Sequence, residues 1–200
     1  MLIVSPGCCG RNTSVLSSMR AYQDRFYYLL MDETDIVTGR HLKKIPKAVA
    51  EICEGLKKKP SVVMICITCV DALLGTDMER VCHKAEEYAG VPVRPCYMYA
   101  LTREGRKPPM VHVRQSVYSL LEPKKKKGNV VNLLGYFSPL TDDCELYDLL
   151  HGAGVKTIHE ISRCKDYAQY QTMSEANFNL VLHPDCLLYT SPSPRDGATS

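Results

Sequence analysis

The sequence predicts an α/β protein made of two units, each built on a parallel sheet. Three observations support this expectation. Short β-branched runs alternate with stretches of helical period, which is typical of parallel strands joined by right-handed crossovers. The alternation stops at a basic stretch, residues 123–129, and then restarts. The most regular stretch, residues 61–97, reads as strand, loop, helix and strand, with a cysteine in the loop.

The first predicted strand, residues 2–5 (LIVS), leads into a glycine-rich turn at residues 6–10 (PGCCG). Cys8 and Cys9 lie between its glycines, where the missing Cβ lets the backbone approach a bulky group closely. The elements expected next are a helix over about 13–20 and a strand over 26–31, which ends in a polar stretch at 32–35. An amphipathic helix is expected over 41–56. Pro46 should lie in its first turn, and lysines follow its end.

The third predicted strand, residues 62–67, is apolar and β-branched throughout, which favours burial on both faces. Cys69 follows its carboxyl end, where open parallel sheets place ligands. A turn through Asp71 and Gly75 then leads to a helix that a Thr76–Glu79 capping box should start. Gly90 ends this helix, and residues 91–98 predict the fourth strand.

The second half repeats this rhythm more loosely. A loop at 102–109 and a helix over 111–121 complete a first domain, residues 1–122. Residues 123–129 are expected to be a solvated linker, and residues 130–186 the start of a second domain. Its expected elements are strands at 130–134, 155–160 and 178–182 and helices at 141–153 and 166–173. Residues 187–200 have no periodicity and are expected to be a non-native tail of an incomplete chain.

The composition excludes several classes of function. A net charge of +3 is too small to indicate a nucleic-acid partner, and no apolar run is long enough to span a membrane. Without a secretory signal, the chain is expected in the cytoplasm. Its ten cysteines are then thiols or metal ligands rather than disulfides, and most of them are expected to be packing residues.

The spacing of Cys66 and Cys69 (CxxC) allows a zinc or dithiol site, but no second pair at finger spacing follows. Cys66 lies within the strand and is expected to pack inside the sheet. Cys69 and either Cys8 or Cys9 each follow the carboxyl end of a strand, so they can converge on one crevice. Thiolates from two glycine-containing loops favour an iron–sulfur cluster, whose other ligands another segment or a partner must supply.

The histidines carry less information. His41 and His83 fall in helical stretches, while His112, His151 and His159 have no neighbouring carboxylate or cysteine pattern. Each is expected to be a packed or solvated residue. The sequence also contains no serine-centred elbow, P-loop or GxGxxG motif, so no catalytic residue is assigned.

Three segments in order carry a resemblance: residues 5–10 (SPGCCG), 30–39 (LMDETDIVTG) and 68–77 (TCVDALLGTD). They resemble nitrogenase component 1 type oxidoreductases, in which a cysteine follows the first of these strands, a "DE-DIVFGG" segment precedes a helix, and a "C-P-x-x-L-I-G-D-D" loop carries another cysteine. Residues 130–182 are similar to the family's second Rossmann-like domain. The resemblance covers nearly all of residues 1–186.

The resemblance implies Rossmann-like domains and a cluster shared between two subunits. Cys69 matches one ligand position, and Cys9, which precedes Gly10, is preferred over Cys8 for the other. The cluster is expected to be P-cluster-like or [4Fe-4S], and a further metallocofactor or a tetrapyrrole is compatible with the family. The implied partners are a homologous second subunit and an ATP-dependent iron–sulfur reductase.

Two functions follow from the resemblance. The preferred one is a subunit of a nitrogenase-like oxidoreductase that takes electrons from the reductase through the cluster. The alternative is a related scaffold without enzymatic activity on which a metallocofactor is assembled. The segment at residues 11–13 (RNT) departs from the aromatic-rich segment of true nitrogenase, which favours a nitrogenase-like protein.

Overall fold

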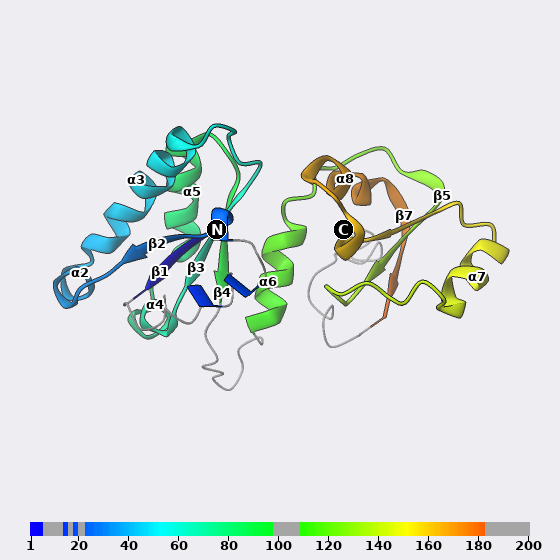
Figure 1. Cartoon of the computed structure of the whole chain (residues 1–200), viewed down its shortest axis with the longest axis horizontal. Helices are drawn as coiled ribbons and strands as arrows, with labels where there is room; N and C mark the ends of the chain where they lie inside the picture. Colours follow the sequence, from blue (N-terminus) through cyan, green and yellow to red (C-terminus); the bar gives the residue numbers. More distant parts are fainter. Residues whose placement is uncertain (6–13, 16–17, 20–22, 98–108, 183–200) are drawn as a thin grey trace, which may run out of the picture. The chain divides into compact units, whose positions relative to one another are not determined.

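The computed structural model describes residues 1–5, 14–15, 18–19, 23–97 and 109–182. The chain divides into two compact units, Met1–Ser116 and Val117–Ser200. Both units contain a parallel sheet with helices, so the α/β class is confirmed (Figure 1). The glycine-rich turn with Cys8 and Cys9, most of the helix expected over 13–20, nearly all of the loop expected over 102–109 and the expected tail lie outside the described residues.

The first unit is built on a four-stranded sheet of order β2-β1-β3-β4, in which every neighbouring pair is parallel. The strands lie within one or two residues of the ranges that the sequence predicts. Their bounds are β1 Leu2–Ser5, β2 Tyr27–Leu30, β3 Val63–Ile67 and β4 Val93–Tyr97.

Two long helices, α3 (Arg40–Gly55) and α5 (Met78–Ala89), cover one face of this sheet. Apolar residues at helical spacing on both helices meet alternate residues of the strands, as the period-two geometry of a strand requires. The resulting core is fully buried at its centre. It comprises Leu2, Val4, Met31, Ile45, Val49, Cys53, Val63, Ile65, Met78, Cys82, Ala85, Ala89, Val91 and Val93.

The other face of the sheet carries the cysteines of β3 and β4. Cys66 and Cys96 lie directly opposite each other in the strand register and are both buried. Val113 of α6 (Pro109–Tyr118) packs against them from above the sheet. The expectation that Cys66 packs inside the sheet is therefore confirmed.

Two short helices form where the sequence predicts irregular structure. One follows the second strand, where a polar stretch is expected, and the other follows the third strand, where a turn is expected. α2 (Glu33–Thr38) starts where a polar exit is expected, because the Asp32 carboxylate accepts a hydrogen bond from the backbone N–H of Asp35 at 2.7 Å. α4 (Cys69–Leu74) replaces the expected turn, and Gly75 ends it at a φ of +65°. Both predictions were wrong because such short helices leave too little periodicity to detect.

Two helix starts also differ from expectation. Asp77, and not Thr76, caps α5: its Oδ1 accepts from the backbone N–H of Arg80 at 3.0 Å. α3 starts at Arg40, so Pro46 is its seventh residue and not part of the first turn. Proline there lacks the N–H of one helical hydrogen bond, and its ring is fully buried in exchange.

The second unit has a three-stranded parallel sheet of order β6-β5-β7. Its elements follow the predicted order, with the helices shorter than expected. They are β5 Lys127–Leu134, α7 Glu145–Gly152, β6 Thr157–Glu160, the 3₁₀ turn η2 Ile161–Arg163, α8 Tyr167–Gln171, the 3₁₀ turn η3 Thr172–Glu175 and β7 Ala176–Val181.

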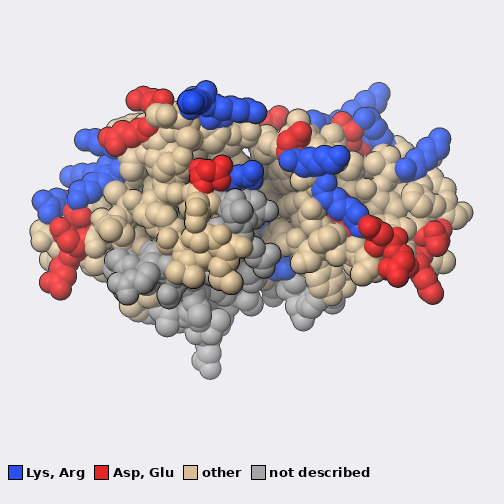
Figure 2. All heavy atoms as spheres, in the orientation of Figure 1, with Lys and Arg blue, Asp and Glu red and all other residues tan. Residues whose placement is uncertain are grey.

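The basic stretch that leads into β5 has specific contacts at Lys126 and at Lys127, the first residue of the strand. Nζ of Lys126 donates to the carbonyl of Ser174 at 2.8 Å, and Nζ of Lys127 pairs with the Glu175 carboxylate at 2.5 Å. On the face shown in Figure 2, lysines and arginines alternate with acidic residues instead of forming one basic field. No helix among the described residues is long and apolar enough to cross a membrane.

Candidate functional site

The candidate site lies at the carboxyl edge of the first sheet, where Cys69 directly follows β3. Cys69 is the first residue of α4, is partly exposed and is a free thiol. β1 pairs with β3 in the register Leu2 to Ile65. Continued by three residues, this register places Ser5, the last residue of β1, beside Thr68. The chain therefore leaves β1 toward the glycine-rich turn at the place where Cys69 begins α4.

Buried hydroxyls line this edge. The Ser5 side chain is fully buried, and its Oγ has no hydrogen-bond partner among the described residues. Thr68 occupies the N-cap position of α4, yet its side chain makes no capping bond and its Oγ1 is likewise buried and unpaired within the described part of the chain. Unpaired buried polar atoms are rare in folded proteins.

Asp71, two residues after Cys69, is buried and pairs with a histidine 30 positions earlier. Nε2 of His41 lies 3.2 Å from Oδ1 of Asp71, and both side chains are at most 1% exposed. The other ring nitrogen, Nδ1, lies 3.0 Å from the carbonyl oxygen of Asp35. A carbonyl only accepts, so Nδ1 carries a proton and donates it. One further proton is then shared between Nε2 and Oδ1.

Burial disfavours the ionised form of the Asp71 carboxyl. Burial raises its pKa, and the neighbouring His41 ring and Thr76 hydroxyl offset only part of that effect. Its second oxygen, Oδ2, is buried without a well-oriented donor among the described residues. Besides His41, the Thr76 hydroxyl and the Thr68 backbone N–H also contact this carboxyl, and His41 is its ring partner.

Asp35 connects this pair to the surface. Its side chain is buried, and Oδ2 accepts from Nζ of Lys44 at 2.7 Å. Arg40 Nε lies 3.5 Å from Oδ1. The Lys44 hydrogen bond is the main reason that the pKa of the Asp35 carboxyl lies below its ordinary value.

Large apolar side chains are exposed at the same edge. Val37 of α2 is 85% exposed, and Leu73 and Leu74 of α4 are 64% and 52% exposed. Both helices follow the carboxyl ends of strands and lie at the same end of the sheet (Figure 1). Single exposed apolar residues are ordinary, and here three lie on the two short helices at this edge.

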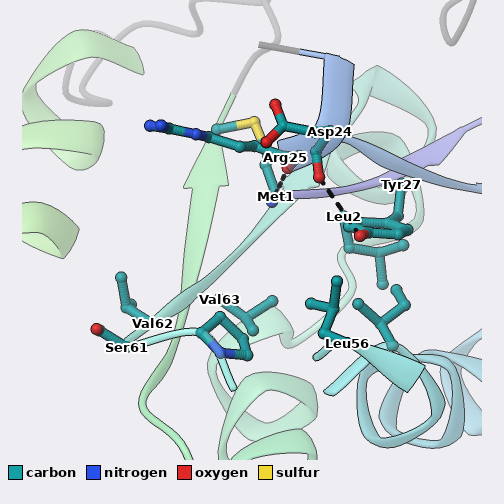
Figure 3. A pocket seen from close by; sticks show the side chains of 11 residues that line it. Met1, Leu2, Asp24, Arg25, Tyr27, Leu56, Ser61, Val62 and Val63 are labelled. Atoms are coloured by element: carbon teal, nitrogen blue, oxygen red, sulfur yellow. Dashed lines mark hydrogen bonds between the residues drawn. The ribbon is translucent and has the colours of Figure 1, made fainter. Parts of the chain in front are cut away.

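A cavity lies at the opposite, amino edge of the sheet (Figure 3). Its volume is about 350 Å³, and Met1 and Arg25 face Val62 and Val63 across it. The N-terminal ammonium donates to the carbonyl of Arg25 at 2.5 Å. Because ligands of open parallel sheets bind at the carboxyl ends of strands, this cavity is separate from the candidate site.

The other expected residues lie as follows. Cys69 reaches the predicted edge, while Cys8 and Cys9 lie outside the described residues, so the choice between them stays a prediction. Within the described chain, no three Cys, His, Asp or Glu side chains gather into a metal site. His83 is exposed and pairs with Glu87, as expected of a solvated residue.

The pair of His41 and Asp71 was not found from the sequence. One signal was present: His41 continues the row of Ile45, Val49 and Cys53 at a spacing of four, which indicates the buried face of the helix. Its partner lies in a different segment, and no local pattern links the two.

Comparisons with known proteins agree with this architecture. The family described as Nitrogenase component 1 type Oxidoreductase matches residues 1–191. The chain is similar to the nitrogenase iron-molybdenum cofactor biosynthesis protein NifE of Rhizobium meliloti (32% identity over 127 residues, 62% of this chain and 26% of the relative). It is also similar to NifE of Rhodobacter capsulatus (26% identity over 195 residues, 94% of this chain and 40% of the relative).

Among solved structures, "Nitrogenase Cp1 at pH 5" has a TM-score of 0.66 at 21% identity, covering 94% of this chain and 40% of that one. This likeness shows a shared fold. The chain spans less than half the length of these relatives. A family match over nearly the whole chain establishes that it belongs to the nitrogenase component 1 type oxidoreductases.

Proposed function

We propose that this chain is part of a subunit that binds an iron–sulfur cluster through Cys69 and serves in the assembly of a metallocofactor. The observation that carries the proposal is the position of Cys69: a free, partly exposed thiol at the carboxyl end of β3, beside the exit of β1. Thiolates are the ligands that iron–sulfur clusters use, and a bound cluster supplies one-electron transfer.

The residues at this edge fit such a group in part. Cys69 offers one soft donor, and the hydroxyls of Ser5 and Thr68, unpaired within the described chain, are polar atoms available at the same edge. The proposal assigns the second ligand of this chain to Cys9, with Cys8 as the alternative. It assigns the remaining ligands to a homologous second subunit, for which the exposed Val37, Leu73 and Leu74 provide an apolar contact surface.

The role in assembly is favoured over substrate reduction by the relatives. The curated proteins cited above are cofactor biosynthesis proteins for the nitrogenase iron–molybdenum cofactor. This reverses the preference drawn from the sequence, where the scaffold was the alternative. The oxidoreductase function, with electrons from an ATP-dependent iron–sulfur reductase, stays a second candidate because the family is described as an oxidoreductase family.

The proposal is tested by iron analysis after anaerobic co-expression of the chain with its second subunit. Changing Cys69 to Ala is expected to remove the bound iron and sulfide. Cys144→Ala is the matched control, because Cys144 is a partly exposed free cysteine of the second unit. Equal iron in the Cys69→Ala and control proteins would refute cluster binding at this edge.

The two candidate functions differ in a second measurement. A scaffold is expected to activate a nitrogenase component that lacks its cofactor when the two are mixed. An oxidoreductase subunit is expected instead to oxidise the reductase partner in an ATP-dependent reaction. Turnover of the reductase without cofactor transfer would overturn the assembly role and leave the oxidoreductase.

A further inference from the structure

The helix that carries Cys69 has little to hold it in place. α4 is only six residues long, and an isolated helix of that length is unstable in water. Of its six residues, all described, Asp71 is the only buried one. Its largest apolar side chains, Leu73 and Leu74, are exposed. The buried anchor of the helix is therefore a carboxylate and not an apolar side chain.

His41 holds that carboxylate from the neighbouring helices. Its ring lies in the first turn of α3 and bonds in two directions, through Nδ1 to the backbone of α2 at Asp35 and through Nε2 to Asp71. The ring is 1% exposed and completely fixed at both nitrogens. One imidazole thus joins α2, α3 and α4 behind the partly exposed thiol.

The pair is unsuited to chemistry on a ligand. Both side chains are shielded from solvent, and both ring nitrogens of His41 are already engaged by protein atoms. Direct contact with a cluster or substrate belongs to Cys69. Groups behind a metal ligand fix its orientation, and removing one costs about 10–100-fold in metal affinity.

We propose that His41 is a positioning residue for Cys69: through Asp71 it fixes the first turn of α4 and with it the direction of the thiol. The orientation of the thiol is a property of the chain alone. Its consequence for a bound cluster rests on the function proposed above.

Two polar variants separate the two contacts of the ring. In His41→Asn, the shorter amide can reach the Asp35 carbonyl, as Nδ1 does, but not Asp71. In His41→Gln, the longer amide can reach Asp71, as Nε2 does. His83→Leu is the matched control on the exposed surface of α5, because His83 is 77% exposed.

The first readout is the rate of iodoacetamide alkylation at each cysteine of the metal-free, reduced full chain, measured by mass spectrometry. In His41→Asn, the rate at Cys69 is expected to rise, because a loosened first turn of α4 gives the reagent more access to the thiol. Buried Cys53 and Cys82 should keep their slow rates. His41→Gln and His83→Leu should match the parent.

Two results would overturn the proposal. One is an unchanged rate at Cys69 in His41→Asn. The other is a parallel rise at Cys53, Cys82 and Cys69, which would give His41 a general role in folding. If His41→Asn does not fold, an elevated Cys69 rate in folded His41→Gln would also contradict the assignment, because the contact with Asp71 is retained there.

The second readout is iron binding in the complex with the second subunit, where His41→Asn should lower the iron affinity about 10–100-fold. Iron that is insensitive to Cys69→Ala would refute the cluster while leaving the alkylation result valid. Loss of iron in Cys69→Ala with no alkylation change in His41→Asn would refute positioning alone.

Discussion

Replacing His41 by Leu should strongly destabilise the first unit, and replacing its partner as well should restore much of the loss. The single change removes the one ring that pairs with Asp71, a carboxyl that is 1% exposed. The double change, His41→Leu with Asp71→Leu, fills the same space with apolar groups. The comparison separates the cost of an unpaired buried charge from the value of the pair.

The size of the effect follows from the burial of both groups. Breaking a buried pair by removing one partner costs about 3–5 kcal/mol. That is a large part of the roughly 5–15 kcal/mol that stabilises a typical domain. Replacing both partners by apolar residues of similar volume is often neutral or stabilising. The double variant should therefore be at least about 2 kcal/mol more stable than the single one.

Hydrogen exchange measured by mass spectrometry on the full chain is the suitable assay, because two units make a single free energy of unfolding ill-defined. Peptides of β1, β3 and α5 report opening of the first unit, and peptides of β5 in the second unit serve as the internal reference. A loss of 3–5 kcal/mol should lower amide protection in the first unit by about two to four orders of magnitude.

Two outcomes would refute the reasoning. A single variant within about 0.5 kcal/mol of the parent, the range of an ordinary surface substitution, would show that Asp71 is not held by His41. A double variant no more stable than the single one would show that the loss comes from packing of the ring and not from an unpaired carboxyl.

Three further predictions test the packing and hydrogen bonds of the first unit around the site. Burial raises the pKa of Glu86, but hydrogen bonds from the Val93 backbone N–H and the Arg94 guanidinium outweigh it, so the net pKa is lowered. The ionised carboxylate therefore stabilises the folded state above the ordinary Glu value of about 4.3, and this contribution is lost as the pH falls through the folded pKa. Glu86→Gln should cost about 0.5–1 kcal/mol at pH 7 and progressively less below about pH 4 when exchange of first-unit peptides is measured at each pH, and a cost that is independent of pH would contradict this. Ile65→Ala, at a fully buried position of β3, should cost about 2–5 kcal/mol by the same exchange assay, and a value under 1 kcal/mol would mean that the core is not packed there. Gly75→Ala places a Cβ in open space but at a φ of +65°, so it should cost about 1 kcal/mol and loosen α4; no change in exchange of the α4 peptide would count against the left-handed end of that helix.

The sequence by itself determined the architecture and the place of the thiol. Alternation of β-branched runs with helical periods is a local property, and it correctly predicted the order of the described strands and of the helices α3, α5, α6, α7 and α8. The position of Cys69 followed from the same pattern, because a residue directly after a buried parallel strand lies at the carboxyl edge of the sheet. The three motifs in order were sufficient to indicate the family.

Only the tertiary structure revealed what holds that thiol. The short helices α2 and α4 have too few residues for a periodic signal, and their capping and anchoring contacts decide that they form. The pairing of His41 with Asp71 joins segments 30 residues apart, and it exists because β3 and α3 bring these segments together. Local sequence patterns do not indicate which buried polar groups contact each other, because these contacts depend on packing between distant segments.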